Sequence, residues 1–373
     1  MTTAAAQKRI LITGGGTGGH VYPALAIYES LKNTGEYEFL YVGGKHGIET
    51  RIVPARGIAM ETIWIAGLAR SLSPKNLMFP VKLLVSLGQS WRIVRRFRPH
   101  AAVGTGGYVS GPILYAAAKM GVPVLIFDAD AHPGITSRLL ARYARRICLG
   151  FAAARHFFTG DEDKLHFTGN PVRSGLIRND RDALLRKFGF SSQRLTLLVF
   201  GGSQGARAIN QAMALLAPEL LEDAPLQILW QCGRGEFERL RNSLSLPEDR
   251  VKLLPYIEEM SEAYTVADII LCRAGATTLA ELAIVAKPTI LVPYPFAAGN
   301  HQVHNARAMM EAGAALMVEQ GEGWERKLAG ALQKLITDEN LRQQQSAAWQ
   351  TLAKPDAARE IAQLVLELAE RGA

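Results

Sequence analysis

Long apolar runs and paired cysteines are both missing from this sequence of 373 residues. No stretch approaches the roughly 18 uncharged apolar residues that a membrane-spanning helix needs. The three cysteines, Cys148, Cys232 and Cys272, are far apart and form no Cys-x-x-Cys pair, which excludes a disulfide framework and favours a reducing, cytoplasmic setting. The first residues are small and polar and lead directly into Lys8–Ile12, without the apolar core of a signal peptide. We therefore expect a soluble or peripheral protein.

Acidic residues are scarcer than basic ones, with 34 Asp and Glu against 42 Lys and Arg, and the net charge is +8. Such a charge favours an anionic partner: a nucleotide, a nucleic acid or an acidic membrane surface. We expect no nucleic-acid partner, because the basic residues do not alternate with aromatic ones and no helix-turn-helix or zinc module is present. A hydrophobic fraction of 48% excludes a disordered chain.

Short apolar runs alternate with longer helical patterns, which predicts repeated β-α units on parallel sheets. The strands expected in the first half are Arg9–Thr13, Glu38–Val42, Ala59–Trp64, Ala101–Gly104, Val124–Phe127 and Arg146–Leu149. Those expected in the second half are Leu195–Phe200, Gln227–Trp230, Val251–Leu254, Asp268–Cys272 and Thr289–Val292.

The pattern starts again in the middle of the chain, because Arg9–Thr13 and Leu195–Phe200 are each followed by a glycine-rich loop and a helical stretch. This repetition predicts an α/β fold of two Rossmann-like, doubly wound domains. We expect them at residues 1–172 and 173–354, with the boundary at the turn Asn170–Arg173. A terminal helix near Asp356–Ala369, within residues 355–373, is expected to pack back on the first domain.

The first glycine-rich loop, Gly14–Gly19, lies between a predicted strand and a helix predicted at Tyr22–Leu31. Glycines let backbone N–H groups approach an anion, and the helix N-terminus adds partial positive charge. The loop fits the dinucleotide pattern Gly-x-Gly-x-x-Gly, but the next strand runs into Gly44-Lys45 without the acidic residue that holds an NAD ribose. It also lacks the Lys-Ser/Thr of a phosphate-binding P-loop. A tight structural turn is the remaining alternative.

Two further glycine loops, Thr105–Pro112 and Gly201–Ala206, also follow predicted strands and precede predicted helices. Each alone can be a structural turn. Three such loops at the carboxyl ends of parallel strands favour a phosphate ligand and an anionic acceptor in a cleft between the domains.

These loops, together with Asn170–Arg173, Cys272–Thr278 and Glu281, resemble those of the MurG family of glycosyltransferases, in the same order over nearly the whole chain. The resemblance implies a GT-B architecture, in which two Rossmann-like domains face each other across a cleft. It implies inverting transfer of N-acetylglucosamine from UDP-N-acetylglucosamine to the 4-hydroxyl of undecaprenyl-diphosphate-linked N-acetylmuramyl-pentapeptide, without a metal or another cofactor. It also implies a role in peptidoglycan synthesis, cell shape and division, a peripheral position on the cytoplasmic face of the plasma membrane, and other cell-wall synthesis proteins as partners.

The resemblance assigns donor binding mainly to the second domain. Ser203 and Arg173 are expected at the donor phosphates, the backbone of Ile257 at the uracil, and Gln302 at the donor sugar. The next donor segment comprises Ala276, Thr277, Thr278, Leu279, Ala280 and Glu281, with Glu281 accepting the ribose hydroxyls. Thr17, Gly18 and Gly19 are expected to face the sugar and the acceptor diphosphate. The chemistry agrees, since a carboxylate suits a ribose diol and a helix N-terminus suits a departing diphosphate; a solvated helix residue is the alternative for Glu281.

One strand end departs from the family. Where MurG enzymes usually have His-Glu-Gln-Asn, this chain has Phe127-Asp128-Ala129-Asp130, so Asp130 replaces the Asn that touches the donor sugar. Asp-x-Asp is also the metal motif of single-domain glycosyltransferases, but those enzymes lack a second Rossmann half. We therefore expect Asp130 to orient the acceptor or donor sugar, and no metal site here.

Glycosyl transfer also needs a base for the proton of the acceptor hydroxyl. His20, directly after the first glycine loop, is the first candidate and Asp128 the second. A histidine at a helix start can instead cap the helix or fill space. His301 and His304 have i, i+3 spacing but no third ligand in the sequence pattern, so we expect no metal there.

The stretch Pro74–Arg98 is predicted as one cationic, amphipathic helix that suits an anionic bilayer surface. Its apolar stripe comprises Phe79, Lys82, Leu83, Ser86, Leu87, Ser90 and Val94, and its basic residues are Lys75, Arg92, Arg95, Arg96 and Arg98. The segment Leu139–Arg146 adds to this basic surface. An ordinary packing helix is the alternative, and the resemblance favours the membrane.

Three other functions remain open. The substitution at Asp128–Asp130 leaves room for a divergent UDP-sugar glycosyltransferase that acts on another lipid, such as a diacylglycerol or a sterol. A UDP-N-acetylglucosamine 2-epimerase shares the architecture but does not need the glycine loop Thr105–Pro112. A nucleotide-binding regulatory protein fits if the base is absent.

Overall fold

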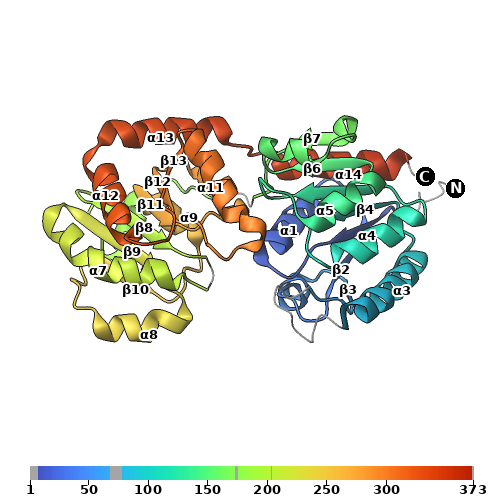
Figure 1. Cartoon of the computed structure of the whole chain (residues 1–373), viewed down its shortest axis with the longest axis horizontal. Coiled ribbons are helices and arrows are strands. Elements are labelled where there is room, and N and C mark those ends of the chain that lie inside the picture. Colours follow the sequence, from blue (N-terminus) through green and yellow to red (C-terminus); the bar gives the residue numbers. More distant parts are fainter. Residues whose placement is uncertain (1–6, 68–77, 173–174, 203, 372–373) are drawn as a thin grey trace. The chain divides into compact units, whose positions relative to one another are not determined.

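The structure is a computed structural model that describes residues 7–67, 78–172, 175–202 and 204–371. The chain divides into two compact units (Figure 1). The first comprises Met1–Val172 with Lys354–Ala373, and the second comprises Arg173–Ala353. Each contains one parallel β-sheet with helices between its strands, which confirms the prediction of two Rossmann-like α/β domains.

The sheet of the first unit has seven parallel strands in the order β3-β2-β1-β4-β5-β6-β7. Their bounds are β1 Arg9–Thr13, β2 Glu38–Gly44, β3 Met60–Ile63, β4 Ala101–Gly104, β5 Val124–Asp128, β6 Arg146–Leu149 and β7 Leu165–Phe167. The central strands are covered on both faces, so successive residues such as Ile10, Leu11 and Ile12 are all buried. This double burial is why these strands are continuous apolar runs in the sequence.

The helices of the first unit are α1 Gly18–Lys32, α2 Glu49–Ile52, α3 Phe79–Phe97, α4 Ser110–Lys119, α5 Ile135–Leu140 and α14 Ala357–Arg371. Helix α4 contacts both α3 and α5, and its Ile113 and Leu114 pack with Leu11 and Ile126 of the sheet in one core. The terminal helix α14 packs against α1, β4 and β5, and Figure 1 shows it in red among the blue and green elements of this unit.

The second unit has six parallel strands in the order β10-β9-β8-β11-β12-β13. Their bounds are β8 Leu195–Phe200, β9 Leu226–Gln231, β10 Val251–Leu254, β11 Ile269–Cys272, β12 Thr289–Leu291 and β13 Ala315–Met317. The helices are α6 Arg181–Phe188, α7 Arg207–Asp223, α8 Arg234–Ser243, α9 Met260–Val266, α10 Ala276–Val285, α11 His301–Glu311, α12 Trp324–Thr337 and α13 Glu339–Leu352. Trp230 of β9 packs in the core with Met213 of α7 and Leu328 of α12.

The sequence missed β7 and β13, each of which lies at one edge of its sheet. Each has only three residues, which is too short for an apolar pattern to emerge. They are strands because each pairs in parallel with the strand before it, β6 or β12, across the helical segments that separate the two in the chain. The other predicted strands are confirmed, and their ends differ from the predicted ends by at most two residues.

The apolar stripe predicted on α3 faces the core of the unit and not its surface, so that prediction is wrong. Ser86, Ser90 and Val94 are buried, and Phe79 and Leu83 pack against the core, so the stripe expected to suit a membrane faces the interior of the unit. A second apolar set on the same helix is exposed: Val81 46%, Leu84 71%, Val85 38% and Trp91 40%. The predicted start of the helix at residues 74–77, including Lys75, lies outside the described residues. Among the described helices, none is both long and apolar enough to cross a membrane.

Candidate functional site

Both sheets reverse their strand order where glycine loops leave the strands. In the first unit the reversal lies between β1 and β4, which are followed by Gly14–Gly19 and Thr105–Pro112. In the second unit it lies between β8 and β11, which are followed by Gly201–Ala206 and by Arg273–Gly275, the short loop that leads into α10. Ligands of doubly wound sheets bind beyond the carboxyl ends of the strands at such a reversal. The topology thus makes neighbours of loops that are far apart in the sequence.

The first two glycine loops touch through their backbones. Gly107 has φ +81°, and a Cβ there would lie 2.3 Å from the carbonyl oxygen of Gly15. Gly106 has φ +99°, and a Cβ there would lie 2.7 Å from Nδ1 of His20. Only glycine fits both positions, because the backbone is left-handed and the opposite loop occupies the side-chain space. The two loops therefore present one continuous backbone surface.

The ring of His20, in the first turns of α1, is oriented by the second loop. Its Nδ1 lies 3.0 Å from the carbonyl oxygen of Thr105. A carbonyl oxygen only accepts, so Nδ1 carries a proton, and in the neutral ring the lone pair is on Nε2. The Thr105 hydroxyl in turn donates to the carbonyl oxygen of His20 at 2.6 Å. The ring of His20 is thus oriented so that Nε2, rather than Nδ1, is the nitrogen available to accept a proton.

The residues just before His20 form the start of α1. Thr17 is its N-cap residue, and the Thr17 side chain makes no capping hydrogen bond. Thr17 and Gly19 are exposed and Gly18 is half-buried. The first backbone N–H groups of a helix have no partner within the helix, so this exposed end is suited to an anion.

Asp128, at the end of β5, holds the loop that follows it. Its oxygens accept from the backbone N–H groups of Asp130 at 3.2 Å and Gly134 at 3.1 Å. Burial raises its pKa to about 6, and hydrogen bonds from Ser137 and the backbone oppose part of that rise. Asp130 is half-buried in the anchored loop. Among the described residues, no group of three His, Cys, Asp or Glu side chains is placed to hold a metal ion.

In the second unit, the loop after β8 is locked to the end of β9. A Cβ on Gly205 would lie 2.1 Å from the carbonyl oxygen of Cys232. The buried side chain of Gln231 donates to the carbonyl oxygen of Gly202 at 2.8 Å and accepts from the N–H of Ile257 at 3.4 Å. Gln231 therefore joins the third glycine loop to the segment expected to meet the uracil, a link that the sequence analysis missed. The predicted phosphate contacts Arg173 and Ser203 lie outside the described residues.

Helix α10 begins at the carboxyl end of β11 with Gly275 as its N-cap residue, without a side-chain cap. The N–H groups of Ala276, Thr277 and Thr278 therefore form an uncapped helix start. The hydroxyl of Thr277 is buried and has no hydrogen-bond partner within the part of the chain that the structure describes. Leu279 is only 2% exposed, so its side chain belongs to the core and only its backbone can meet a ligand. Ala280 is half-buried.

Glu281 on α10 and Gln302 on α11 each accept a hydrogen bond from another segment. One oxygen of Glu281 accepts from the hydroxyl of Tyr264 at 2.8 Å, and Tyr264, on α9, is fully buried. The side-chain oxygen of Gln302, on α11, accepts from the backbone N–H of Tyr294 at 2.9 Å. Tyr264 is a further residue that the sequence analysis missed, because it lies outside every recognised motif.

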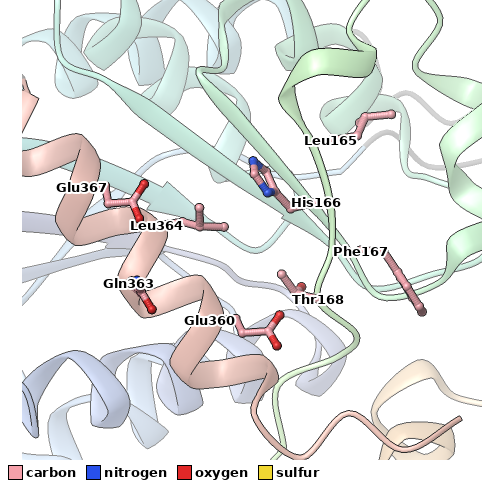
Figure 2. Close-up of a pocket in the computed structure, with 8 residues that line it drawn as sticks. All are labelled: Leu165, His166, Phe167, Thr168, Glu360, Gln363, Leu364 and Glu367. Carbon is pink, nitrogen blue, oxygen red and sulfur yellow. The ribbon is translucent and has the colours of Figure 1, made fainter. Parts of the chain in front are cut away.

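A cavity of about 460 Å³ lies elsewhere in the first unit, between β7 and α14 (Figure 2). It is lined by Leu165, His166, Phe167, Thr168, Glu360, Gln363, Leu364 and Glu367. None of these residues belongs to the predicted site, and β7 is the outermost strand rather than a strand at the reversal. This cavity is therefore separate from the candidate site.

Comparisons with known proteins agree on the family. The sequence matches the glycosyltransferase family 28 N-terminal domain over residues 10–149 and the glycosyltransferase family 28 C-terminal domain over residues 196–361. It is 42% identical to the UDP-N-acetylglucosamine--N-acetylmuramyl-(pentapeptide) pyrophosphoryl-undecaprenol N-acetylglucosamine transferase of Moorella thermoacetica, over 98% of this chain and 100% of the relative. It is 39% identical to the enzyme of the same name from Desulforamulus reducens, over 97% and 99%. The crystal structure of Acinetobacter baumannii MurG superposes with a TM-score of 0.79 at 28% identity, over 96% of this chain and 99% of that one.

The raised pKa of Asp128 predicts a pH-dependent stability. The folded chain keeps this proton between about pH 4 and pH 6 while the unfolded chain releases it, so the free energy of unfolding falls as the pH rises through that window. From pH 4 to pH 7, the free energy of unfolding of the wild type should therefore fall by roughly 2–3 kcal/mol relative to that of Asp128→Asn, which has no carboxylate to titrate at this position. Denaturant unfolding at several pH values measures it.

Asp163→Asn, which removes an exposed carboxylate from the same unit, is the matched control and should track the wild type. Parallel wild-type and Asp128→Asn curves would show that the burial of Asp128 does not perturb its titration.

Proposed function

This chain belongs to glycosyltransferase family 28 and to its MurG branch, and from that membership we propose how its residues catalyse the reaction of the branch. The reaction is the transfer of N-acetylglucosamine from UDP-N-acetylglucosamine to undecaprenyl-diphosphate-linked N-acetylmuramyl-pentapeptide. It converts lipid I into lipid II in peptidoglycan synthesis, and through the cell wall it serves cell shape and division. The residue roles below rest on one observation: the glycine loops and Glu281 lie beyond the carboxyl ends of the strands at the two reversals.

The donor binds to the second unit. The start of α10 supplies N–H groups and partial positive charge for the diphosphate, together with Ser203 and Arg173. Glu281 accepts the ribose hydroxyls, and its hydrogen bond from Tyr264 supports this role because it fixes the carboxylate in one orientation. The backbone of Ile257 meets the uracil, and the amide NH2 of Gln302 donates to the sugar while its oxygen is held by Tyr294.

The acceptor binds to the first unit, with its diphosphate at Thr17, Gly18 and Gly19. As the 4-hydroxyl oxygen bonds to the anomeric carbon, Nε2 of His20 takes the hydroxyl proton. The bond between that carbon and the UDP oxygen breaks, and the electron pair leaves with UDP. Attack from the face opposite UDP inverts the anomeric carbon. The hydrogen bond from Nδ1 to Thr105 supports this assignment, since it leaves the basic lone pair on Nε2.

We assign the base to His20 rather than Asp128, because Asp128 is buried and its oxygens hold the loop after β5. That loop carries Asp130, which we propose orients a sugar hydroxyl. The transfer needs no metal in this proposal, since the α10 N-terminus and Arg173 stabilise the charge that develops on the leaving diphosphate.

The first unit docks on the cytoplasmic face of the plasma membrane through α3 and α5. Leu84 and Trp91 on α3, and Ile135 and Leu139 on α5, are large apolar side chains that are 71%, 40%, 68% and 63% exposed. Both helices pack against α4, and they also carry basic residues: Lys82, Arg92, Arg95, Arg96 and Arg138. Exposed apolar side chains on helices that also carry cations suit an anionic lipid surface. Docking there brings the enzyme to its lipid-anchored acceptor and to other proteins of cell-wall synthesis.

For the donor site, Glu281→Ala should weaken UDP binding by about 2 kcal/mol, roughly thirtyfold, because the ribose hydroxyls lose a charged acceptor. Tyr264→Phe keeps the buried ring and removes only the hydroxyl that orients Glu281, so it should cost about 1 kcal/mol, roughly fivefold. Isothermal titration with UDP measures both. An affinity for UDP equal to the wild type in both variants would refute the ribose role of Glu281.

For the base, His20→Ala should lower turnover by roughly 100-fold to 1,000-fold with little change in UDP affinity, because proton transfer occurs on the acceptor side. The assay measures disaccharide formation from UDP-N-acetylglucosamine and a short-chain lipid acceptor. If the variant is fully active, His20 is not the base and another group removes the proton.

The same assay tests the stereochemistry and the absence of a metal. Wild-type activity should survive EDTA, and the product should carry the β-linkage that inversion of the α-linked donor requires. Loss of activity in EDTA that Mg²⁺ or Mn²⁺ restores would instead favour a metal at Asp128 and Asp130.

For the membrane, the double variant Leu84→Ser and Leu139→Ser should bind vesicles that contain anionic lipid at least about fivefold more weakly, because less apolar area enters the bilayer surface. Co-sedimentation with the vesicles measures it. Leu215→Ser is the matched control, since Leu215 on α7 of the second unit is also 71% exposed. Equal binding by the double variant and the control would rule out docking through α3 and α5.

A further inference from the structure

A buried carboxylate lies beneath the first glycine loop. Glu49, the first residue of α2, is 1% exposed. One of its oxygens accepts from the N–H of Gly16 at 3.0 Å, and the other accepts from the N–H of Gly44 at 2.9 Å. A single side chain therefore ties the loop after β1 to the end of β2.

The backbone closes tightly around this carboxylate. A Cβ on Gly47 would lie 2.0 Å from one Glu49 oxygen, and a Cβ on Gly15 would lie 2.3 Å from the other. A Cβ on Gly43 would lie 2.7 Å from the Glu49 side chain. Glycines from three segments thus make room for one charged group, and hydrogen bonds to a charged acceptor are stronger than neutral ones.

Tyr41 on β2 gives the loop a second anchor. Its hydroxyl donates to the carbonyl oxygen of Gly14 at 2.6 Å, and the Tyr41 side chain is fully buried. Burial, and secondarily the negative charge of Glu49, raises the pKa of Tyr41. The hydroxyl therefore stays protonated as a donor at ordinary pH. Tyr41 on β2 thus holds Gly14, and Glu49, which follows β2 in the chain, holds Gly16.

The two anchors decide which part of the loop can meet an anion. The N–H of Gly16 points to Glu49, so it does not point to a ligand, and the carboxylate charge beneath the loop disfavours an anion at its inner end. Anion binding is left to the other end, where Thr17, Gly18 and Gly19 start α1 and His20 follows.

We propose that Glu49 is a positioning residue for the acceptor: it fixes the first glycine loop so that the start of α1 faces the acceptor diphosphate and His20 faces the hydroxyl. This inference rests on the acceptor-side role proposed above for the loop. Glu49 acts through Gly16 and does not touch a substrate.

The test is Glu49→Gln. Glutamine has nearly the same shape, but its amide NH2 would face one of the two N–H donors, so one anchor is lost and the loop shifts. We expect kcat/KM for a short-chain lipid acceptor to fall at least about tenfold, with a higher acceptor KM. The donor KM and the UDP affinity, which belong to the second unit, should stay unchanged. Amide hydrogen exchange at Gly16 and Gly44 should become faster.

Glu38→Gln is the control, because Glu38 is an exposed carboxylate at the start of β2, the strand whose last residue, Gly44, donates to Glu49; it should change none of these values. If Glu49→Gln does not fold, Tyr41→Phe carries the test, since it removes one hydroxyl from the other anchor and should raise the acceptor KM in the same direction. An unchanged acceptor KM in a folded variant, or equal losses on the donor and acceptor sides, would overturn the proposal.

The test of Glu49 can fail or succeed independently of the proposal that His20 is the base. If His20→Ala is fully active, the base assignment fails, while the acceptor KM and the hydrogen exchange of Glu49→Gln still decide the role of Glu49. If His20→Ala is inactive and Glu49→Gln has normal acceptor kinetics, only the inference on Glu49 fails.

Discussion

The backbone contact between the loops after β1 and β4 is the constraint on which the site of the first unit depends. A side chain at Gly107 would collide with the carbonyl of Gly15, and one at Gly106 would collide with the ring of His20. The strand order reverses between β1 and β4, so these two strands lie side by side although they are not consecutive in the chain. The loops that follow them therefore come close together. That same closeness gives His20 its Nδ1 partner, the carbonyl oxygen of Thr105, and so selects the tautomer that can accept a proton on Nε2.

Buried polar side chains from adjacent elements hold the candidate site in both units. Glu49 binds the N–H of Gly16 in the first unit, while in the second Gln231 binds the carbonyl of Gly202 and Tyr264 donates to Glu281. Each is buried, so its hydrogen bonds are worth more than they would be in water and their loss is correspondingly costly. Glycine has no side chain that could fix the shape of such a loop. The hydrogen bonds of these neighbouring side chains fix it instead.

Helix α3 shows why an apolar pattern alone does not identify a surface. The sequence contains two apolar sets on this helix, and the stripe that includes Leu83, Ser86 and Val94 turns toward the core. Leu84 and Trp91 belong to the set that remains exposed. Both sets have helical spacing, so the choice between them depends on where α4 and the sheet lie, and that is a property of the packed unit. On α3, the proposal for membrane docking therefore rests on apolar residues other than those of the predicted stripe, while the basic residues are the same.

The sequence by itself determined the fold class, most strands, the three glycine loops and the family, because these features are encoded in contiguous residues: apolar runs such as Arg9–Thr13 and loops such as Gly14–Gly19. Tertiary structure alone decided the edge strands β7 and β13, the burial of Leu279, the hydrogen bond that orients His20, and the contacts of Glu49, Gln231 and Tyr264. Each of these depends on groups that are distant in sequence, such as Thr105 for His20 and Glu281 for Tyr264. A hydrogen bond of that kind leaves no periodic trace in the chain, since it requires only one residue at each end and a fold that brings the two together.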